Sequence, residues 1–98
     1  MKKQFMVEFE LPEELTNDFT RLIPAQRDTV SQLFSQGHLK SYSLATDRSV
    51  MWAIFMAESE FEVLEMVAQF PLAEFMTPYI SELMFHSSDS RVLNFSLN

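Results

Sequence analysis

Few side chains in this chain of 98 residues are suited to proton transfer. Cysteine is absent, and the two histidines are His38 and His86. The imidazole of His86 could act as a general acid or base near neutral pH, because histidine changes its charge in that range. The structural alternative for His86 is a contact between subunits, and His38 is interpreted as a surface residue. The spacing of the two histidines predicts no metal site.

Glu8 and Glu10 are two residues apart in a segment where apolar and polar residues alternate, so their carboxylates share one face of a predicted strand. A carboxylate enclosed inside a protein can hold and release a proton, because burial favours its neutral form. The alternative is an ion pair between Glu8 and Lys40 or Arg27, with Glu10 exposed at the rim. The candidate catalytic residues are therefore Glu8 and His86.

Hydroxyl and aromatic side chains concentrate in the middle of the chain. Ser41, Tyr42 and Ser43 follow one another in one predicted strand, and Trp52 lies in the next. Such side chains could line a substrate pocket with hydroxyl groups and an aromatic wall. For Trp52 the alternative is a place in the core. Gly37 is the only glycine, which excludes glycine-rich phosphate loops, and we expect no cofactor.

Hydrophobic periodicity predicts the elements that must position these side chains. Pro24 interrupts the first predicted helix and marks either a kink or the first turn of its main part. Gly37 suits the left-handed C-cap of that helix. Alternation favours strands at residues 5–11, 39–44, 50–56 and 76–86, and helical spacing favours helices at 15–34 and 59–68.

The second predicted helix has a clear start. Ser59 suits the N-cap, and Glu62 stands three residues later, which is the spacing of a capping box. Helical periodicity then predicts a stripe of buried apolar residues. The expected stripe consists of Phe61, Leu64, Val67 and Ala68.

The order of the predicted elements is β-α-β-β-α-β, which is the ferredoxin-like arrangement of the α+β class. Its antiparallel four-stranded sheet carries both helices on one face, so the other face must meet solvent, a ligand or another sheet. Pairing of two such sheets would give a dimeric α/β barrel with a pocket in each half. We expect residues 1–98 to form one domain, with residues 88–98 as a C-terminal tail or an extra edge strand.

The composition favours self-association. Hydrophobic residues make up 47% of the chain, with ten phenylalanines and seven methionines, and a domain of this size has little interior to hide them. The net charge of −7 argues against nucleic acid or an anionic membrane as a partner. No apolar run is long enough to span a membrane, and the lack of cysteine suits the cytoplasm. We expect a cytoplasmic homodimer or higher homo-oligomer that could hold a small apolar ligand.

The stretch at residues 69–88 joins a predicted helix to the last strand through Pro71 and Leu72, three further residues, and Met76. This segment resembles the corresponding one of the muconolactone isomerases, small enzymes that shift a double bond in a lactone. The resemblance extends over residues 20–88 without gaps. The landmarks shared across the domain are Leu11, Pro12, Leu33, Gly37, Phe55, Ser59, Gln69, Pro71, Leu72, Met76, Leu83 and His86.

The resemblance implies the dimeric α/β barrel, higher oligomers such as decamers, subunit contacts through the C-terminal segment, and proton transfer without a cofactor. Members of that family carry basic residues on the open face of the first strand, where this chain has Met6 and Glu8. They also carry an Asn-Tyr pair where this chain has Met51 and Trp52. These differences predict a less cationic, more apolar pocket and an altered substrate.

Two functional hypotheses follow. The first is an isomerase that moves a proton on a small, rather apolar lactone or carbonyl compound, with Glu8 or His86 as the proton carrier. The second is a protein that keeps the barrel and serves small-molecule binding or assembly without catalysis. Replacing Glu8 or His86 by alanine would remove turnover in the first case and would alter only stability or assembly in the second.

Overall fold

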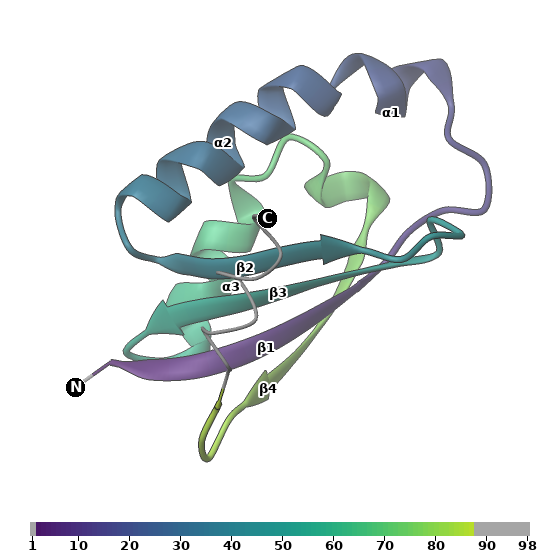
Figure 1. The fold of residues 1–98 in the computed structure, drawn as a ribbon. Helices are drawn as coiled ribbons and strands as arrows, with labels where there is room; N and C mark the ends of the chain where they lie inside the picture. The colour runs from purple at the N-terminus through teal and green to yellow at the C-terminus, as the bar shows by residue number, and fades with distance from the viewer. Residues whose placement is uncertain (1, 88–98) are drawn as a thin grey trace, which may run out of the picture.

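The computed structural model describes residues 2–87, and the predicted tail at residues 88–98 lies outside the described residues. Figure 1 shows the chain fold from the N-terminal strand to the segment that follows the last strand. The elements in chain order are β1 (Lys3–Glu10), α1 (Asn17–Arg21), α2 (Ile23–Ser35), β2 (Leu39–Leu44), β3 (Val50–Ala57), α3 (Glu60–Ala68), the 3-10 turn η1 (Ala73–Phe75) and β4 (Thr77–Glu82).

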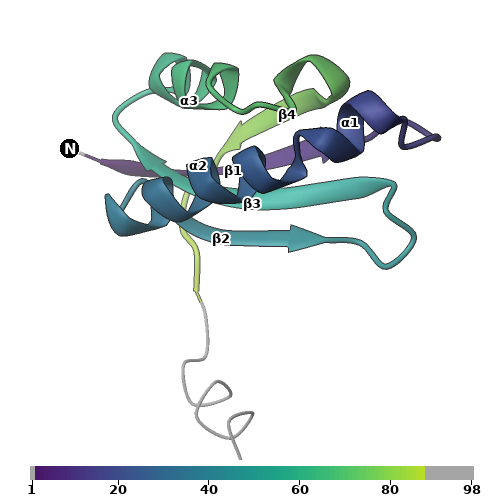
Figure 2. The ribbon, with the colours of Figure 1, turned by 90° about the horizontal axis from the view of Figure 1, so that it is seen from above.

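The strands form one antiparallel sheet with the order β2-β3-β1-β4. Helices α1, α2 and α3 lie on the same side of this sheet, and the other side carries no helix of the described chain (Figures 1 and 2). This arrangement confirms the predicted ferredoxin-like α+β fold. No helix among residues 2–87 combines the length and the apolar character that crossing a membrane requires.

The core lies between the helices and one face of the sheet. Phe5, Val7 and Phe9 of β1 point to the helices and are fully buried. Phe70, which follows α3, packs on Phe9 with ring centroids 5.8 Å apart. The alternation of apolar residues in β1 thus decides which face of the sheet is covered. The cross-strand partners on β3 that face the same way are Phe55, Ala53 and Met51.

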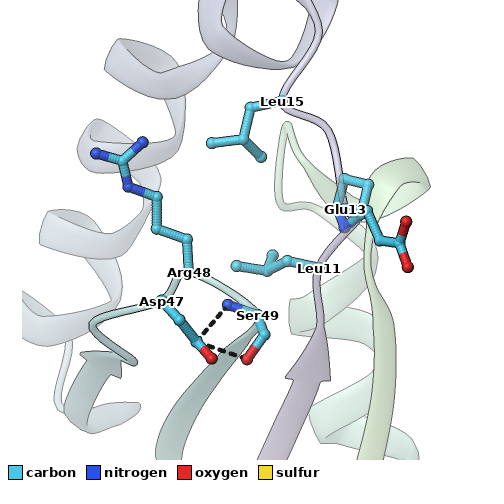
Figure 3. A pocket seen from close by; sticks show the side chains of 7 residues that line it. Leu11, Glu13, Leu15, Asp47, Arg48 and Ser49 are labelled. Atoms are coloured by element: carbon cyan, nitrogen blue, oxygen red, sulfur yellow. Dashed lines mark hydrogen bonds between the residues drawn. The ribbon is translucent and has the colours of Figure 1, made fainter.

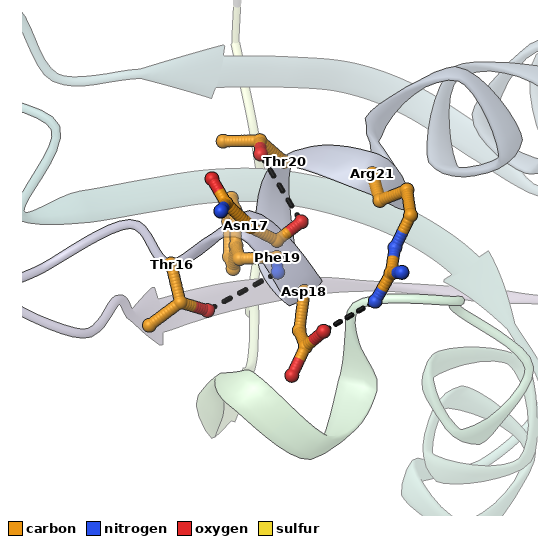
Figure 4. A network of polar contacts seen from close by, with 6 residues as sticks. All are labelled: Thr16, Asn17, Asp18, Phe19, Thr20 and Arg21. Carbon is orange, nitrogen blue, oxygen red and sulfur yellow. Dashed lines mark hydrogen bonds and ion pairs between the residues drawn. The ribbon is translucent and has the colours of Figure 1, made fainter.

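Two helices replace the single first helix that the sequence predicted. Short α1 begins after Thr16, whose Oγ1 accepts a hydrogen bond of 3.3 Å from the Phe19 backbone N–H, and Asp18 pairs with Arg21 across it (Figure 4). Pro24 lies in the first turn of α2, where a missing backbone N–H costs no helical hydrogen bond. Of the two predicted roles of Pro24, the first-turn position is therefore the correct one.

Gly37 ends α2 as predicted. Its φ of +80° lies in the left-handed region that glycine adopts without a steric penalty. The His38 N–H donates to the Leu33 carbonyl over 3.0 Å, and the Gly37 N–H donates to the Phe34 carbonyl over 3.1 Å. These two hydrogen bonds are those of a Schellman motif, which turns the chain from α2 into β2.

The start of α3 was predicted correctly, but its buried face was not. The Ser59 Oγ accepts a hydrogen bond of 3.2 Å from the Glu62 backbone N–H. Phe61, Leu64 and Ala68 are exposed, contrary to the predicted stripe. Two apolar stripes overlap on this helix, and the packing of α3 on β3 selects one of them. The residues of α3 that are buried are Val63, Met66 and Val67.

The last strand is shorter than predicted. β4 ends at Glu82, and the Leu83 N–H adds one hydrogen bond of 2.8 Å to the carbonyl of Gln4. In this register Lys3, the first residue of β1, stands opposite Met84, so a strand that continued to His86 would run past the end of β1. His86 therefore lies in the exposed segment after the strand and not within it.

Candidate functional site

The predicted site residues divide between the two faces of the sheet. Ser43, Trp52 and Glu8 form one cross-strand row, which Tyr79 of β4 continues. This row lies on the face without helices, because the residues on either side of Glu8 in β1 point to the core. Ser41 lies on the same open face, one row further along β2. Four of the six predicted residues thus share a face that one chain leaves uncovered.

Hydrogen bonds join the polar groups of this row and of the next one. The Trp52 Nε1–H donates to Glu8 Oε1 over 3.1 Å, and the Tyr79 hydroxyl donates to Glu10 Oε1 over 2.9 Å. The hydrogen bond to Glu10 raises the pKa of Tyr79. Among residues 2–87, Glu8 has an indole partner and no cation at ion-pair distance. The open face therefore combines aromatic surface with two carboxylates.

Tyr42 points to the opposite face from Ser41 and Ser43, since neighbours along a strand alternate. Its hydroxyl accepts a hydrogen bond of 3.1 Å from Gln26 Nε2 of α2. Gln26 Oε1 in turn accepts from the Leu72 backbone N–H over 3.2 Å. Gln26 is only 4% exposed and is the one buried polar side chain among residues 2–87. This amide fixes the position of Tyr42 beneath α2.

Tyr42 and Gln26 border a cavity of about 740 Å³ between the helices α1 and α2 and the β2 side of the sheet. A cavity of this size is in the range of small-molecule sites, which hold about 300–1,000 Å³. Apolar side chains from both helices and from β2 and β3 make up most of its wall. The lining residues are Leu11, Leu15, Phe19, Thr20, Ile23, Gln26, Arg27, Val30, Ser31, Phe34, Tyr42, Leu44, Arg48, Met51 and Leu72.

The Tyr42 hydroxyl is a hydrogen-bond donor without an acceptor. Its oxygen accepts from Gln26, and no group of residues 2–87 accepts its proton. Burial raises the pKa of Tyr42 above the ordinary value of 10.0, and the hydrogen bond from Gln26 offsets part of that rise. The phenol is therefore neutral at physiological pH, and its O–H can donate to a ligand oxygen inside the cavity.

Two arginines line the cavity, although the sequence did not place them there. Arg27, which the sequence suggested as an ion-pair partner of Glu8, belongs to α2, and Arg48 belongs to the turn between β2 and β3. Figure 3 shows the Arg48 side chain extending toward the helices beside Leu15. It also borders an adjoining cavity of about 520 Å³. The orientation of the Arg48 side chain depends on its left-handed backbone conformation, with a φ of +64°. No pattern in the sequence predicts that conformation.

Neither histidine reaches the cavity. His86 is exposed in the segment after β4, and His38 follows the end of α2, where its Nδ1 is buried without a partner in the described chain. No cluster of three or more histidine, aspartate or glutamate side chains within residues 2–87 could hold a metal ion. The cavity wall, as far as the structure describes it, supplies hydroxyl and guanidinium donors and an amide, with neither carboxylate nor imidazole.

Comparison with known proteins identifies the scaffold. The family profile described as muconolactone delta-isomerase matches residues 3–89, nearly the whole chain. The chain belongs to the muconolactone delta-isomerase family. This membership confirms the resemblance that the segment at residues 69–88 suggested. No curated protein sequence matches this member of the muconolactone delta-isomerase family.

A solved structure supports the same assignment at the level of the fold. The crystal structure of muconolactone isomerase superposes on this family member with a TM-score of 0.70. The match covers 88% of this chain and 93% of the other, at 19% sequence identity. At that identity the likeness establishes the common fold of the muconolactone delta-isomerase family, and the chemistry must be argued from the side chains of this chain.

Proposed function

We propose that this family member binds a small, largely apolar lactone or carbonyl compound in the cavity beneath α2 and moves a proton on it without a cofactor. The observation that carries the proposal is the Tyr42 hydroxyl, which has a free proton and faces an apolar cavity of about 740 Å³. The hydroxyl is partly buried, and a ligand carbonyl oxygen would be a suitable acceptor for its proton. The apolar wall supports a small hydrophobic ligand body.

Tyr42 would favour the proton shift by stabilising negative charge on the ligand oxygen. When a proton leaves the carbon next to a carbonyl group, the charge moves to the oxygen and forms an enolate. A fixed O–H donor in an apolar site stabilises that enolate more than it stabilises the ground-state carbonyl. Gln26 supports this role, because it holds the hydroxyl in one orientation through the hydrogen bond of 3.1 Å.

As proton carriers we keep Glu8 and His86, both of which lie outside the described lining of the cavity in one chain. A neighbouring chain would have to bring one of them to the cavity, and His86 is the better placed because its segment extends beyond the sheet. Ser41, Ser43 and Trp52 belong in this proposal to the open face. There they would contact ligand or protein once a second sheet covers them.

Self-association is part of the proposal. The open face carries Trp52, which is 39% exposed, together with the exposed Tyr79. A large aromatic surface on an uncovered sheet favours contact with a second sheet of the same kind. A homodimer built in this way would be the barrel that the family resemblance implies.

A hydrogen-exchange experiment tests the proposed chemistry before the natural substrate is identified. A panel of butenolides, enol lactones and cyclic enones is incubated with the protein in D₂O, and loss of the signal from the proton next to the carbonyl is followed by NMR. We expect exchange with at least one compound, and a slower rate in Tyr42→Phe, Glu8→Gln or His86→Asn. Tyr79→Phe is the matched control, since it removes a tyrosine hydroxyl from the open face.

Binding without turnover is the second candidate function. It is favoured by the cavity wall, which among residues 2–87 contains no carboxylate or imidazole to accept a proton. In that case compounds of the same panel would bind in a manner that depends on Tyr42, as seen by chemical-shift changes. No compound would exchange its protons faster than in buffer, and Glu8→Gln and His86→Asn would leave ligand binding unchanged. Absence of both exchange and Tyr42-dependent binding would contradict both functions.

A further inference from the structure

The outer side of α3 carries apolar side chains that the described chain leaves exposed. Phe61 is 68% exposed, Leu64 is 43% exposed, and Ala68 is exposed as well. These three residues belong to the stripe that the sequence predicted to be buried, whereas the core receives a different set of α3 side chains. Figure 2 shows α3 at one margin of the helical layer, with α2 on its inner side.

The outer stripe of α3 consists of Phe61, Leu64 and Ala68. Residues three, four and seven positions apart lie on the same side of a helix, so these side chains follow one another along two turns. Single exposed apolar residues are ordinary on protein surfaces, but a helix that is apolar on two sides has a second side to bury. The protruding ring of Phe61 and the small Ala68 also provide the relief by which helices pack on one another.

Carboxylates flank the outer stripe without a cation to pair with. Glu60 lies four positions before Leu64 and Glu65 lies four positions after Phe61, so the two exposed carboxylates border the stripe on opposite sides. The ion pairs within residues 2–87 lie elsewhere, and the sequence has no lysine or arginine at positions 49–90. The helix dipole favours Glu60 in the first turn, but it gives no reason for Glu65 in the middle of α3.

We propose that the outer stripe of α3 binds a basic amphipathic helix of a partner protein. The apolar side of the partner would cover Phe61 and Leu64, and lysine or arginine side chains at its margins would pair with Glu60 and Glu65. A second copy of this chain fits less well, because two facing α3 helices would bring unpaired carboxylates together. The segment at residues 88–98 has one arginine and one aspartate, so it offers no net positive charge.

Two synthetic peptides test the proposal. Both have about 14 residues with leucine at helical spacing, and the remaining positions are lysine in one peptide and glutamate in the other. Fluorescence anisotropy of the labelled peptides measures their binding. The stripe spans only two turns, so we expect the weak affinity of a small interface, with a Kd on the order of 10–100 µM for the lysine peptide. The glutamate peptide should bind at least about tenfold more weakly, and salt should weaken the binding of the lysine peptide.

Variants of exposed side chains locate the contact. Phe61→Ser should weaken binding of the lysine peptide by at least about tenfold, because a protruding aromatic residue carries much of the energy of such a contact. Glu65→Gln should weaken it by about threefold, since it removes one charge and keeps the shape. Met84→Ser and Glu14→Gln are the matched controls, because both residues are exposed outside α3, and they should leave binding unchanged. Circular dichroism should show the wild-type fold in each variant.

The outcomes separate the candidate occupants of the outer stripe. Failure of the lysine peptide to bind, equal binding of the glutamate peptide, or binding that survives Phe61→Ser would overturn the proposal. If Phe61→Ser reduced the oligomer mass in sedimentation, a second copy would be the partner instead. If a peptide of residues 88–98 bound more tightly than the lysine peptide and depended on Phe61, the chain's own C-terminal segment would be the occupant. The cavity wall described for residues 2–87 contains no α3 residue, so these outcomes leave the proposed function untouched.

Discussion

The side-chain amide of Gln26 lies 3.1 Å from the hydroxyl of Tyr42, and this contact joins α2 to β2 across the cavity. The other end of the same amide accepts a hydrogen bond from the Leu72 N–H, in the turn after α3. One buried side chain therefore connects three segments that lie far apart in the sequence. A polar group in this position stabilises the fold only while both of its partners are present.

Gln26→Ala is expected to destabilise the protein by about 2–3 kcal/mol. The substitution leaves the Leu72 N–H buried without an acceptor and removes packing beneath α2. The measurement is the free energy of unfolding from urea titration followed by circular dichroism. Gln32→Ala, an exposed change on the same helix, should stay within about 0.5 kcal/mol of the wild type. Equal effects of the two changes would show that the buried amide has no special role.

Stability should fall in alkaline solution because of Tyr42. Burial holds its pKa above the ordinary value of 10.0, so the unfolded chain loses the phenolic proton first as the pH rises. The contribution of Tyr42 to the free energy of unfolding is thus complete below about pH 10 and decreases as the pH rises through the folded-state pKa. Urea unfolding between neutral pH and this range should show the decrease, and Tyr42→Phe should reduce it.

The titration of Tyr42 can be observed separately, since the chain has only one other tyrosine, Tyr79. In Tyr79→Phe, the ultraviolet absorbance of the phenolate reports Tyr42 alone. We expect the midpoint of the Tyr42 titration to lie above that of free tyrosine. Adding Gln26→Ala should raise the midpoint further, because it removes the hydrogen bond that lowers the pKa of Tyr42. A midpoint at or below that of free tyrosine would contradict the buried position of the hydroxyl.

Trp52→Arg tests the proposed contact between open sheet faces. A charge in the middle of such a contact would be desolvated without a partner, so self-association should weaken by about tenfold or more. Sedimentation equilibrium measures the change. Phe61→Arg is the matched control, because Phe61 is 68% exposed on α3, on the opposite side of the sheet. If Phe61→Arg dissociated the oligomer and Trp52→Arg did not, the helices and not the open face would form the contact.

Gly37→Ala should cost about 1 kcal/mol of unfolding free energy for a backbone reason alone. A Cβ atom at Gly37 would meet nothing within 4 Å, so the penalty comes from the φ of +80°. Gly37→Asn should cost less, because asparagine tolerates the left-handed region. Thermal unfolding of the two variants checks the order. A larger loss in the asparagine variant would point to a steric clash that the structure does not contain.

Local patterns predicted the scaffold because each of them depends on neighbours in the sequence. Alternation in β1 identified its buried face, Gly37 ended α2, and Ser59 began α3. The family match confirmed the resemblance that was based on the segment at residues 69–88. The errors occurred where a distant partner decides the outcome. β4 could not extend to His86 because β1, its partner, begins opposite Met84, and the packing on β3 determines which stripe of α3 is buried.

The candidate site was predicted only in part for the same reason. Strand alternation could have separated Tyr42 from Ser41 and Ser43, since neighbours in a strand face opposite ways. The contact between Gln26 and Tyr42 could not be predicted, because it depends on how α2 crosses the sheet. The position of Arg48 at the cavity depends in addition on its own left-handed backbone conformation in the turn.

The sequence by itself determined the order of the elements, the covered face of the sheet and the family, because periodicity and capping are properties of short segments. The tertiary structure decided which polar groups meet. It placed Glu8 against Trp52 on the open face, and Tyr42 against Gln26 beside a cavity whose wall includes Arg48. Such meetings depend on the packing of segments that are distant in the chain, where a shift of a single residue would direct a side chain to the other face of the sheet.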